Sequence, residues 1–362
     1  MPAEASDPSV WVLIGARRGD NNQLLALAEA LGLPFETRQL RTNRLHWLPL
    51  RLLGATFATL KPESRAAVSG EAPDLVLAIG RRSVPVVRAI RQGSRERTRL
   101  VHLGNPRVPV RHFDLVVTTP QYPVADAPNV LKFPIGIGRP SQAQDTSAAS
   151  EEAKRFLAAM PHPRRLLLLG GPTLFWKLDP EDVARAAKAL LSQVEREGGS
   201  LIVLPSPRTP KAALVAARHA IENSRAPAAI AAMEGPPSYT TLLEAADSLF
   251  VTADSVSMVT EALRTGKPVG LVPVRRTWAG ALWLALSDLL RPGRPAFPRD
   301  LRCFWAALER DGLAGSVERP RSGPIPDVPE IAAGRVRQLL RLPPRPATGG
   351  RDSDRSTQAN PA

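Results

Sequence analysis

Residues 249–274, LFVTADSVSMVTEALRTGKPVGLVPV, form a strand–helix–strand pattern that restricts the possible folds more than any other segment. The apolar runs Leu249–Val251 and Val269–Val274 are typical of short buried strands. Between them apolar residues recur at helical spacing, and Gly266 followed by Pro268 predicts where that helix ends. Strands connected through a helix pair in a parallel sheet, so this segment predicts an α/β fold.

The same alternation of strand and helix patterns continues along most of the chain. Six apolar runs predict strands in the first part: Val10–Ile14, Phe35–Leu40, Asp74–Ile79, Leu100–Leu103, Leu115–Thr118 and Val130–Phe133. Later strands are predicted at Arg165–Leu169, Leu201–Leu204 and Ala228–Met233, and helices at Val84–Arg91, Glu181–Arg196, Ala212–Asn223 and Thr241–Ala246. We infer two tandem doubly wound, Rossmann-like α/β domains with a cleft between them.

Breaks in this pattern predict the domain boundaries. Residues 138–152 are small and polar without periodicity, which is typical of a linker, and residues 343–362 are rich in Pro, Gly and Ser, which is typical of disorder. We therefore expect a flexible N-terminus (1–9), an N-terminal domain (10–137), the linker (138–152), a C-terminal domain (153–315), a segment with a helix over Glu330–Leu342 (316–342) and a disordered tail (343–362).

The charge of the chain predicts an anionic partner. Lys and Arg number 48 against 34 Asp and Glu, which gives a net charge of +14 at pH 7. The basic residues are scattered, no nucleic-acid-binding motif is visible, and aromatic residues make up only 5% of the chain. Stacking platforms are therefore few, and we expect no nucleic-acid partner. The remaining candidate partners are an anionic membrane surface and phosphate-bearing ligands.

Several classes of protein are disfavoured by what the sequence lacks. The single cysteine, Cys303, excludes an internal disulfide, and the five histidines are scattered, so we expect no bound metal. The N-terminus has no secretory signal, and no apolar run approaches the roughly 18 residues that a membrane-spanning helix needs. We expect a cytoplasmic protein, either soluble or peripheral on the inner membrane.

The segment Arg41–Lys61 has two interpretations. It interleaves four basic residues with leucines, Trp47 and Phe57. Such a segment either lies at a membrane interface with its cations toward lipid phosphates, or forms a helix packed on the first domain.

Polar loops follow the predicted strands of the first domain, at the sheet edge where open α/β folds bind ligands. We take as candidate acceptor or phosphate ligands Gly19, Asn21, Asn22, Gln23, Arg81, Arg82, Asn105 and Arg107. Glycine lets the backbone approach a ligand, and arginine binds phosphate or carboxylate. The alternatives are structural: Asp20 and Asn21 cap a helix, the arginine pair begins a solvated helix, and Asn105–Arg107 forms a turn.

The second domain has comparable loops. Gly170 and Gly171 either bind phosphate through their N–H groups or form a simple turn, and Arg208 lies beside Thr209. The turn before Val256 opens a helix whose N-terminus suits a phosphate. Glu261 lies away from the apolar face of this helix, where it is either a ligand contact or a solvated residue beside Arg264.

The block that begins Asp254–Ser255, continues through Glu261–Ala262 and ends Gly266–Lys267–Pro268 resembles the donor-site element of GT-B glycosyltransferases. In that fold the small-residue turn approaches the donor phosphates, and the glutamate binds the ribose of the sugar nucleotide.

Taken together, the motifs resemble the bacterial branch of the mitochondrial-fission ("elongated mitochondria") family, over most of residues 10–315. The matching stretches are Gly19–Gln23, Pro73–Leu75, Gly80–Ser83, Asn105–Arg107, Phe113–Thr118, Gly170–Pro172, Arg208–Pro210, Val251–Met258 and Gly266–Pro268. The family is similar in layout to GT-B glycosyltransferases and nucleotide-sugar epimerases.

The resemblance implies a GT-B-type glycosyltransferase with a nucleotide-sugar substrate, no cofactor and no metal, acting in envelope or glycolipid synthesis on a lipid-linked acceptor. The implied base is Asp20, with His102 second. The implied donor site comprises Gly170, Gly171, Arg208, Thr209, Asp254, Ser255, Ser257 and Glu261. Two alternatives follow from the same family: a non-catalytic protein that recruits partners to a membrane, and a nucleotide-sugar epimerase.

Overall fold

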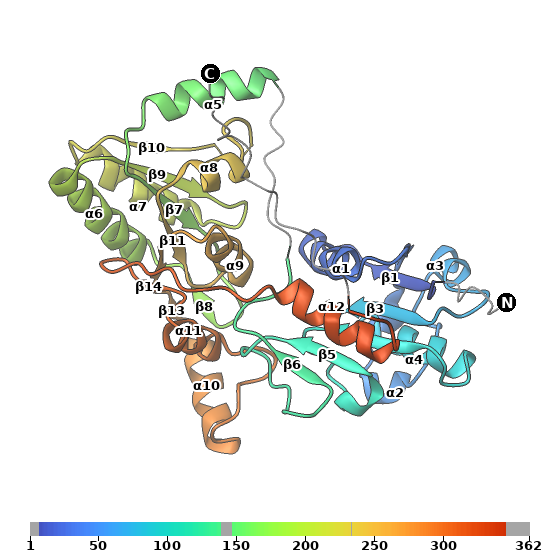
Figure 1. Cartoon of the computed structure of the whole chain (residues 1–362). Coiled ribbons are helices and arrows are strands. Elements are labelled where there is room, and N and C mark those ends of the chain that lie inside the picture. Colours follow the sequence, from blue (N-terminus) through green and yellow to red (C-terminus); the bar gives the residue numbers. More distant parts are fainter. Residues whose placement is uncertain (1–6, 139–146, 233, 345–362) are drawn as a thin grey trace, which may run out of the picture.

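Two parallel six-stranded sheets organise the two halves of the molecule, in a computed structural model that describes residues 7–138, 147–232 and 234–344 (Figure 1). The first sheet has the order β2-β1-β3-β4-β5-β6. Its strands are β1 (Val10–Ile14), β2 (Glu36–Gln39), β3 (Leu75–Ile79), β4 (Arg99–Leu103), β5 (Leu115–Thr118) and β6 (Val130–Lys132). β3, β4 and β5 are almost wholly buried, because helices and loops cover both faces of a parallel sheet.

Helices cover the first sheet on both faces. The buried residues of α1 (Arg18–Leu31) pack with one set of strand side chains, and those of α4 (Val84–Gly93) pack with the alternate set. The shorter elements of this domain are η1 (Arg44–Trp47), α2 (Leu50–Leu53), α3 (Pro62–Ala67) and η2 (Val110–His112).

The second sheet has the order β10-β9-β7-β11-β12-β14. Its strands are β7 (Arg164–Leu169), β9 (Ser200–Pro205), β10 (Ala228–Ile230), β11 (Ser248–Thr252), β12 (Val269–Val272) and β14 (Gly315–Ser316). The helices of this half are α5 (Ser147–Ala158), α6 (Pro180–Glu197), α7 (Lys211–Glu222), α8 (Tyr239–Ala245), α9 (Val256–Arg264), α10 (Trp278–Leu290) and α11 (Leu301–Arg310). A small antiparallel pair, β8 (Trp176–Lys177) and β13 (Arg275–Arg276), adjoins them.

The predicted fold class is confirmed, since both sheets are parallel and follow one another along the chain. Three local predictions need correction. Residues 41–61 form two short turns, η1 and α2, instead of one helix. The expected linker 138–152 overlaps α5, which begins at Ser147, while residues 139–146 lie outside the described part. Helices α10 and α11 are also present, although no sequence pattern predicts them.

The last helix, α12 (Val328–Leu339), returns to the N-terminal half and packs on α1. Its buried residues Val328, Ala332, Ala333 and Val336 join the cluster that contains Leu24 and Leu27 of α1. At the end of this contact Arg337 Nη1 donates to the Leu31 carbonyl oxygen at 2.7 Å. The expected termini, 1–9 and 343–362, lie mostly outside the described residues.

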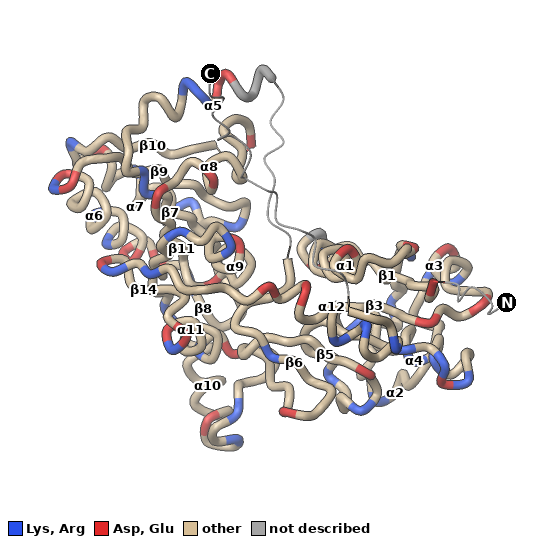
Figure 2. Tube along the Cα trace, viewed as in Figure 1, with Lys and Arg blue, Asp and Glu red and all other residues tan. Residues whose placement is uncertain are grey.

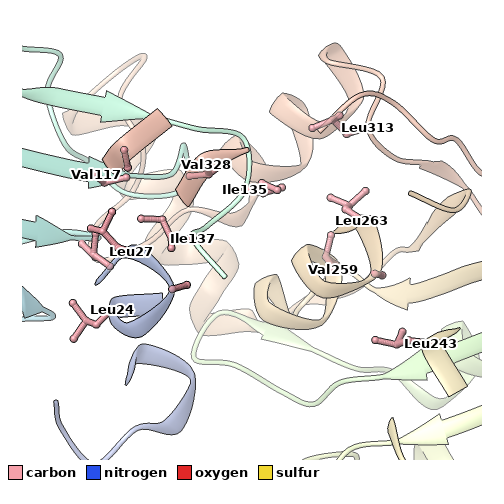
Figure 3. Packing of buried hydrophobic residues seen from close by; sticks show 14 of the residues in the cluster. Leu24, Leu27, Val117, Ile135, Ile137, Leu243, Val259, Leu263, Leu313 and Val328 are labelled. Carbon is pink, nitrogen blue, oxygen red and sulfur yellow. The ribbon is translucent and has the colours of Figure 1, made fainter. Parts of the chain in front are cut away.

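One apolar cluster continues from the first domain into the second (Figure 3). Ile135 and Ile137, in the segment after β6, join it between α1 on one side and α9 on the other. Beside them Arg264 of α9 donates to the carbonyl oxygens of Gly136, at 2.6 Å, and Gly138. This packing fixes α9 against the N-terminal domain.

Candidate functional site

A cleft of about 1740 Å³ lies between the two domains. Its N-terminal wall consists of the loops that follow β1, β3, β4 and β5, so the carboxyl ends of these strands meet there. Its C-terminal wall consists of α9, residues 238 and 240, and residues 298–299. This is the place where open α/β sheets bind ligands.

Three helices begin at this cleft: α1, α4 and α9. Their N-cap residues are Arg17, Ser83 and Ser255, and in the described structure none of these side chains accepts a hydrogen bond from the first turn. In α4 the Val84 N–H donates to the Arg81 carbonyl at 3.4 Å, and the next residue, Pro85, has no N–H. The partial positive charge of free first-turn N–H groups, which attracts anions, therefore applies to α1 and α9.

The side chains of the cleft are predominantly basic. Among the described residues that line it, the acidic ones are Asp20, Glu29 and Glu261. The basic ones are Arg17, Arg41, Lys61, Arg81, Arg82, Arg107, Arg264 and Arg299. Six of these eight belong to the N-terminal domain, and Figure 2 shows Lys and Arg gathered around β3, α4 and α2. Positive charge in a concave site concentrates anionic ligands.

Residues 18–23 of the predicted loop after β1 form the start of α1 instead, and most of the predicted ligands among them face the cleft. Gly19, Asp20, Asn22 and Gln23 line it. Asn21 instead closes the loop, because its Oδ1 accepts from Gly15 N–H at 2.8 Å and its Nδ2 donates to the Gly15 carbonyl at 2.9 Å. The structural alternative, in which Asp20 and Asn21 cap the helix, is wrong, because the N-cap residue of α1 is Arg17.

Asp20 lies in the first turn of α1, at the cleft surface. Burial raises the pKa of its carboxyl, and the neighbouring Arg17 lowers it. A carboxylate with a raised pKa is a stronger proton acceptor.

The second candidate base, His102, lies elsewhere. It is fully buried within β4, outside the cleft lining, and its ring packs against Phe113 with centroids 5.1 Å apart. Burial lowers its pKa to about 4, with a smaller opposing effect from the Gly80 carbonyl. A neutral ring packed inside the sheet cannot reach a substrate, so His102 is not a candidate for the catalytic base.

The predicted arginines and Asn105 lie together on the N-terminal wall. Arg81 donates to the carbonyl oxygens of Trp47, at 3.3 Å, and Leu48. Arg107 has a left-handed backbone with φ 58°, and its N–H donates to Asn105 Oδ1 at 2.9 Å. Its pKa is lowered by burial and then by the charge of Arg81. No carboxylate within the described residues pairs with either guanidinium, so both are available to an anion.

The glycine loop after β7 does not reach the cleft. Gly170 N–H donates to Thr252 Oγ1 at 2.7 Å, and Gly171 N–H donates to Asp254 Oδ2 at 2.8 Å. The neighbouring Thr209 hydroxyl donates to the Gly170 carbonyl at 2.8 Å. We call Gly170, Gly171, Thr209, Thr252 and Asp254 the closed loop cluster.

This cluster corrects the predicted phosphate contact. The two N–H groups that were expected to bind a phosphate already have acceptors in the protein. Gly170, Gly171, Arg208, Thr209, Asp254 and Ser255 are all absent from the described cleft lining. Asp254 is buried, and burial raises the pKa of its carboxyl. Its hydrogen bonds with Thr252 and Gly171 lower the pKa by less.

Two of the predicted donor residues, Ser257 and Glu261, do line the cleft. They lie on the face of α9 opposite to the buried Val259 and Leu263, as predicted. Glu261 is half-buried; burial raises its pKa, and the neighbouring Tyr239 and Arg264 lower it. Glu261 therefore lies partly buried at the cleft surface, beside Tyr239 and Arg264.

Sequence reasoning missed several cleft residues. Arg41 and Lys61 begin and end the segment that has two interpretations from sequence, a membrane-interface segment or a packed helix. Both residues line the cleft, because the Lys61 N–H donates to the Arg41 carbonyl at 2.9 Å and brings the two ends of this segment together. Arg299 follows an unpredicted helix. No local pattern marks these three residues, since only the tertiary fold places them at the cleft. Within the described ranges, no three His, Cys, Asp or Glu side chains gather as metal ligands would.

Residues 18–283 match the family model described as mitochondrial fission ELM1. The chain belongs to this family. It is 28% identical over 232 residues to the mitochondrial fission protein ELM1 of Arabidopsis thaliana, which is 58% of this chain and 53% of the plant protein. The match thus spans about half the length of that relative. An uncharacterised protein of Rickettsia prowazekii is 24% identical over 295 residues, 72% of this chain and 82% of that one.

Two solved structures are among those to which the chain is similar. UDP-GlcNAc 2-epimerase from Methanocaldococcus jannaschii covers 92% of this chain and 99% of its own, with a TM-score of 0.49 and 12% identity. MurG from Acinetobacter baumannii covers 92% of each chain, with a TM-score of 0.48 and 15% identity. The predicted GT-B-like layout is confirmed by the two tandem parallel sheets and the cleft between them.

Proposed function

We propose that this ELM1-family chain is a GT-B-type glycosyltransferase that binds a nucleotide-sugar donor in the interdomain cleft. One observation carries the proposal: Glu261 and Asp20, from opposite domains, line a single basic cleft into which three helices without side-chain caps open. A diphosphate, a ribose and an acceptor hydroxyl each have a chemically matched group there.

The donor is expected on the C-terminal wall. The first-turn N–H groups of α9 suit the diphosphate, a role that the engaged N–H groups of Gly170 and Gly171 cannot take. The Glu261 carboxylate, one turn further along the lining, suits the ribose hydroxyls as a hydrogen-bond acceptor.

The transfer step requires a base on the N-terminal wall, and we assign this role to Asp20, which lines that wall. The acceptor oxygen forms a bond to the anomeric carbon while the bond from that carbon to the diphosphate oxygen breaks. The acceptor proton passes to Asp20, and the electron pair leaves with the diphosphate. The α9 N-terminus and the cleft arginines stabilise the charge that develops on the leaving group.

Calorimetry or thermal shift of the wild-type chain with UDP-, GDP-, ADP- and CMP-sugars tests the donor site. A saturable response to one nucleotide class supports the proposal. No response to any of them, with protein that still shows a cooperative unfolding transition, contradicts it. With the donor identified, Asp20→Asn should abolish transfer while the donor still binds.

The acceptor is proposed to be lipid-linked, at the cytoplasmic face of the inner membrane, in envelope or glycolipid synthesis. The basic N-terminal wall supports this, because it offers Arg81 and Arg107 to an anionic acceptor. Sugar transfer to a lipid extract, against none to soluble hydroxyl acceptors, would support the assignment.

Family membership favours one other candidate, a non-catalytic recruitment protein on the same fold, because the plant relative bears the name of a fission protein. A membrane-dependent partner whose capture survives both Asp20→Asn and Glu261→Gln would favour it. An epimerase, in turn, would yield isomerised sugar nucleotide without any acceptor.

A further inference from the structure

Helix α10 is the largest exposed apolar element in the described part of the chain. Its sequence, WAGALWLALSDLL, is apolar around nearly the whole helix, and Figure 1 shows the helix projecting from the C-terminal domain. Trp278 is 83% exposed, Leu289 77% and Leu282 65%, and Leu286 and Leu290 are exposed as well. A contiguous patch of this kind marks an interaction surface.

Close contacts fix α10 to the domain beneath it. Gly280 lies so near Phe175 that a Cβ atom there would be 2.3 Å from the Phe175 carbonyl oxygen. Leu284 is buried, and the rings of Phe175 and Trp283 stack with centroids 6.2 Å apart. The exposed face is therefore held in place by the fold.

The charges around α10 suit an anionic surface. Its one acidic residue, Asp288, is neutralised by Arg302, whose two terminal nitrogens donate to it at 2.7 and 2.8 Å. Arg291 and Arg294, directly after the helix, are exposed and form no ion pair with any described carboxylate. Exposed arginines next to an apolar face are attracted to lipid phosphates.

The length of α10 restricts how it can meet a bilayer. Thirteen residues extend about 20 Å, which is less than the hydrocarbon thickness of about 30 Å. None of the described helices is both long enough and apolar enough to cross a membrane. Trp278, at the first position of α10, is of the residue type enriched where a bilayer meets water. The helix therefore suits the interface, parallel to the surface.

We propose that α10 is a membrane-docking helix, which places its apolar face in the headgroup region of an anionic bilayer while Arg291 and Arg294 contact lipid phosphates. This assigns the membrane contact to the C-terminal domain, whereas one of the two interpretations of the sequence placed it in residues 41–61. The observations that carry it are independent of the nucleotide site.

Docking through α10 would also bring lipid to the cleft. The segment after the helix leads directly into the cleft lining at Pro298 and Arg299. There the Arg107 guanidinium lies over the Phe297 ring, 5.2 Å from its centroid, and Asp300 N–H donates to the Gln121 carbonyl at 2.7 Å. If the proposed function holds, a lipid-linked acceptor would enter from this side.

Vesicle sedimentation tests the proposal, with phosphatidylcholine vesicles and with vesicles that also contain phosphatidylglycerol. The wild-type chain should bind the anionic vesicles. The double variant Leu282→Gln/Leu289→Gln should bind the anionic vesicles at least about tenfold more weakly, because two exposed apolar side chains are removed from the interface. Arg291→Gln/Arg294→Gln should weaken binding by about tenfold at low salt and less at high salt.

The matched control is Val215→Gln on α7, which replaces another exposed apolar residue, 63% exposed. This variant should bind vesicles like the wild type, and all variants should keep the wild-type melting temperature. Brominated lipids should quench the fluorescence of Trp278, so that Trp278→Phe lowers the quenching and Trp47→Phe does not; the remaining tryptophan of α10, Trp283, is 39% exposed and accounts for residual quenching.

Three results would overturn the proposal. One is unchanged vesicle binding by the α10 double variant, and another is quenching that disappears with Trp47→Phe instead. The third is a lipid-free dimer that the α10 variant dissociates without any change in vesicle binding, because α10 would then contact a second copy. Vesicle binding through α10 without any nucleotide-sugar response would contradict the proposed enzyme and leave this inference intact.

Discussion

The loops after the strands of the first sheet open into the cleft, whereas the comparable loop after β7 in the second sheet is hydrogen-bonded to residues at the end of β11. Both regions have glycine-rich and polar sequences at the carboxyl ends of parallel strands. In the first, Arg81 and Arg107 have no described carboxylate partner. In the second, Thr252 and Asp254 accept the hydrogen bonds of Gly170 and Gly171. Loop sequence alone therefore does not identify a binding loop; the partners of its polar groups do.

The first prediction concerns the scaffold of the C-terminal wall and has the largest expected effect. Val259 is fully buried on the inner face of α9. Val259→Asp should lower the free energy of unfolding by about 3–5 kcal/mol, because it leaves an unpaired charge in the core. Urea unfolding measures the loss. Ser257→Asp, on the exposed face of the same helix, is the control and should cost less than about 0.5 kcal/mol.

The second prediction separates the binding face of α9 from its packing face. Glu261→Gln should weaken nucleotide binding by about 1.5–3 kcal/mol, or roughly 10- to 150-fold in dissociation constant. Stability should stay close to that of the wild type, because Glu261 faces the cleft. Calorimetry with the donor measures the change. Unchanged affinity alongside a destabilised Val259→Asp would mean that α9 is correctly placed and the donor site is elsewhere.

The third prediction compares one glycine from each loop region. A Cβ atom at Gly171 would lie 2.3 Å from the Arg208 carbonyl oxygen, whereas at Gly19 it would meet nothing within 4 Å. Gly171→Ala should therefore destabilise the chain by about 1–3 kcal/mol through overpacking. Gly19→Ala should have no effect or stabilise by about 0.5–1 kcal/mol, since Gly19 lies in the first turn of α1. Equal effects in chemical denaturation would contradict the contrast between the loops.

The fourth prediction concerns pH and the closed loop cluster. Burial raises the pKa of Asp254 in the folded chain above its ordinary value of 3.8. The folded state therefore holds this proton more tightly than the unfolded state does. This contribution to stability is fully present below pH 3.8 and is lost as the pH rises through the folded pKa.

Asp254→Asn should remove this dependence and still accept the Gly171 hydrogen bond. The difference in unfolding free energy between wild type and variant should change across this window, with a slope of at most about 1.4 kcal/mol per pH unit for one proton. Urea unfolding at several pH values measures it. A difference that is constant across this window would show that Asp254 has an ordinary pKa.

The strands were predictable because their signal is local. The limits of β1 and β5 coincide with the predicted runs Val10–Ile14 and Leu115–Thr118, since a strand buried on both faces is a continuous apolar run between turn residues. Helix α10 was not predicted, because WAGALWLALSDLL is apolar on nearly every side and shows no helical period. A pattern method needs a contrast between an apolar and a polar face, and a helix without a polar face offers none.

The residues of the candidate site also divide into those that a local sequence pattern predicts and those that it does not. Sequence indicated the loop after β1 and the cleft face of α9, because a loop at the end of a predicted strand and a glutamate opposite an apolar stripe are local patterns. It also placed Gly170 and Gly171 with these residues. The structure excludes them from the cleft, because their N–H groups donate to Thr252 and Asp254, 82 and 83 positions further along the chain.

The sequence by itself determined the two α/β domains, the order of most strands and helices, and which face of α9 is buried. Spacing and turn chemistry encode these features within a few residues of each other. Tertiary structure alone decided which polar groups are occupied by the protein and which are open to a ligand. It also brought Arg41, Lys61 and Arg299 to one cleft and left α10 uncovered. These outcomes depend on contacts between distant segments, and a local pattern contains no record of them.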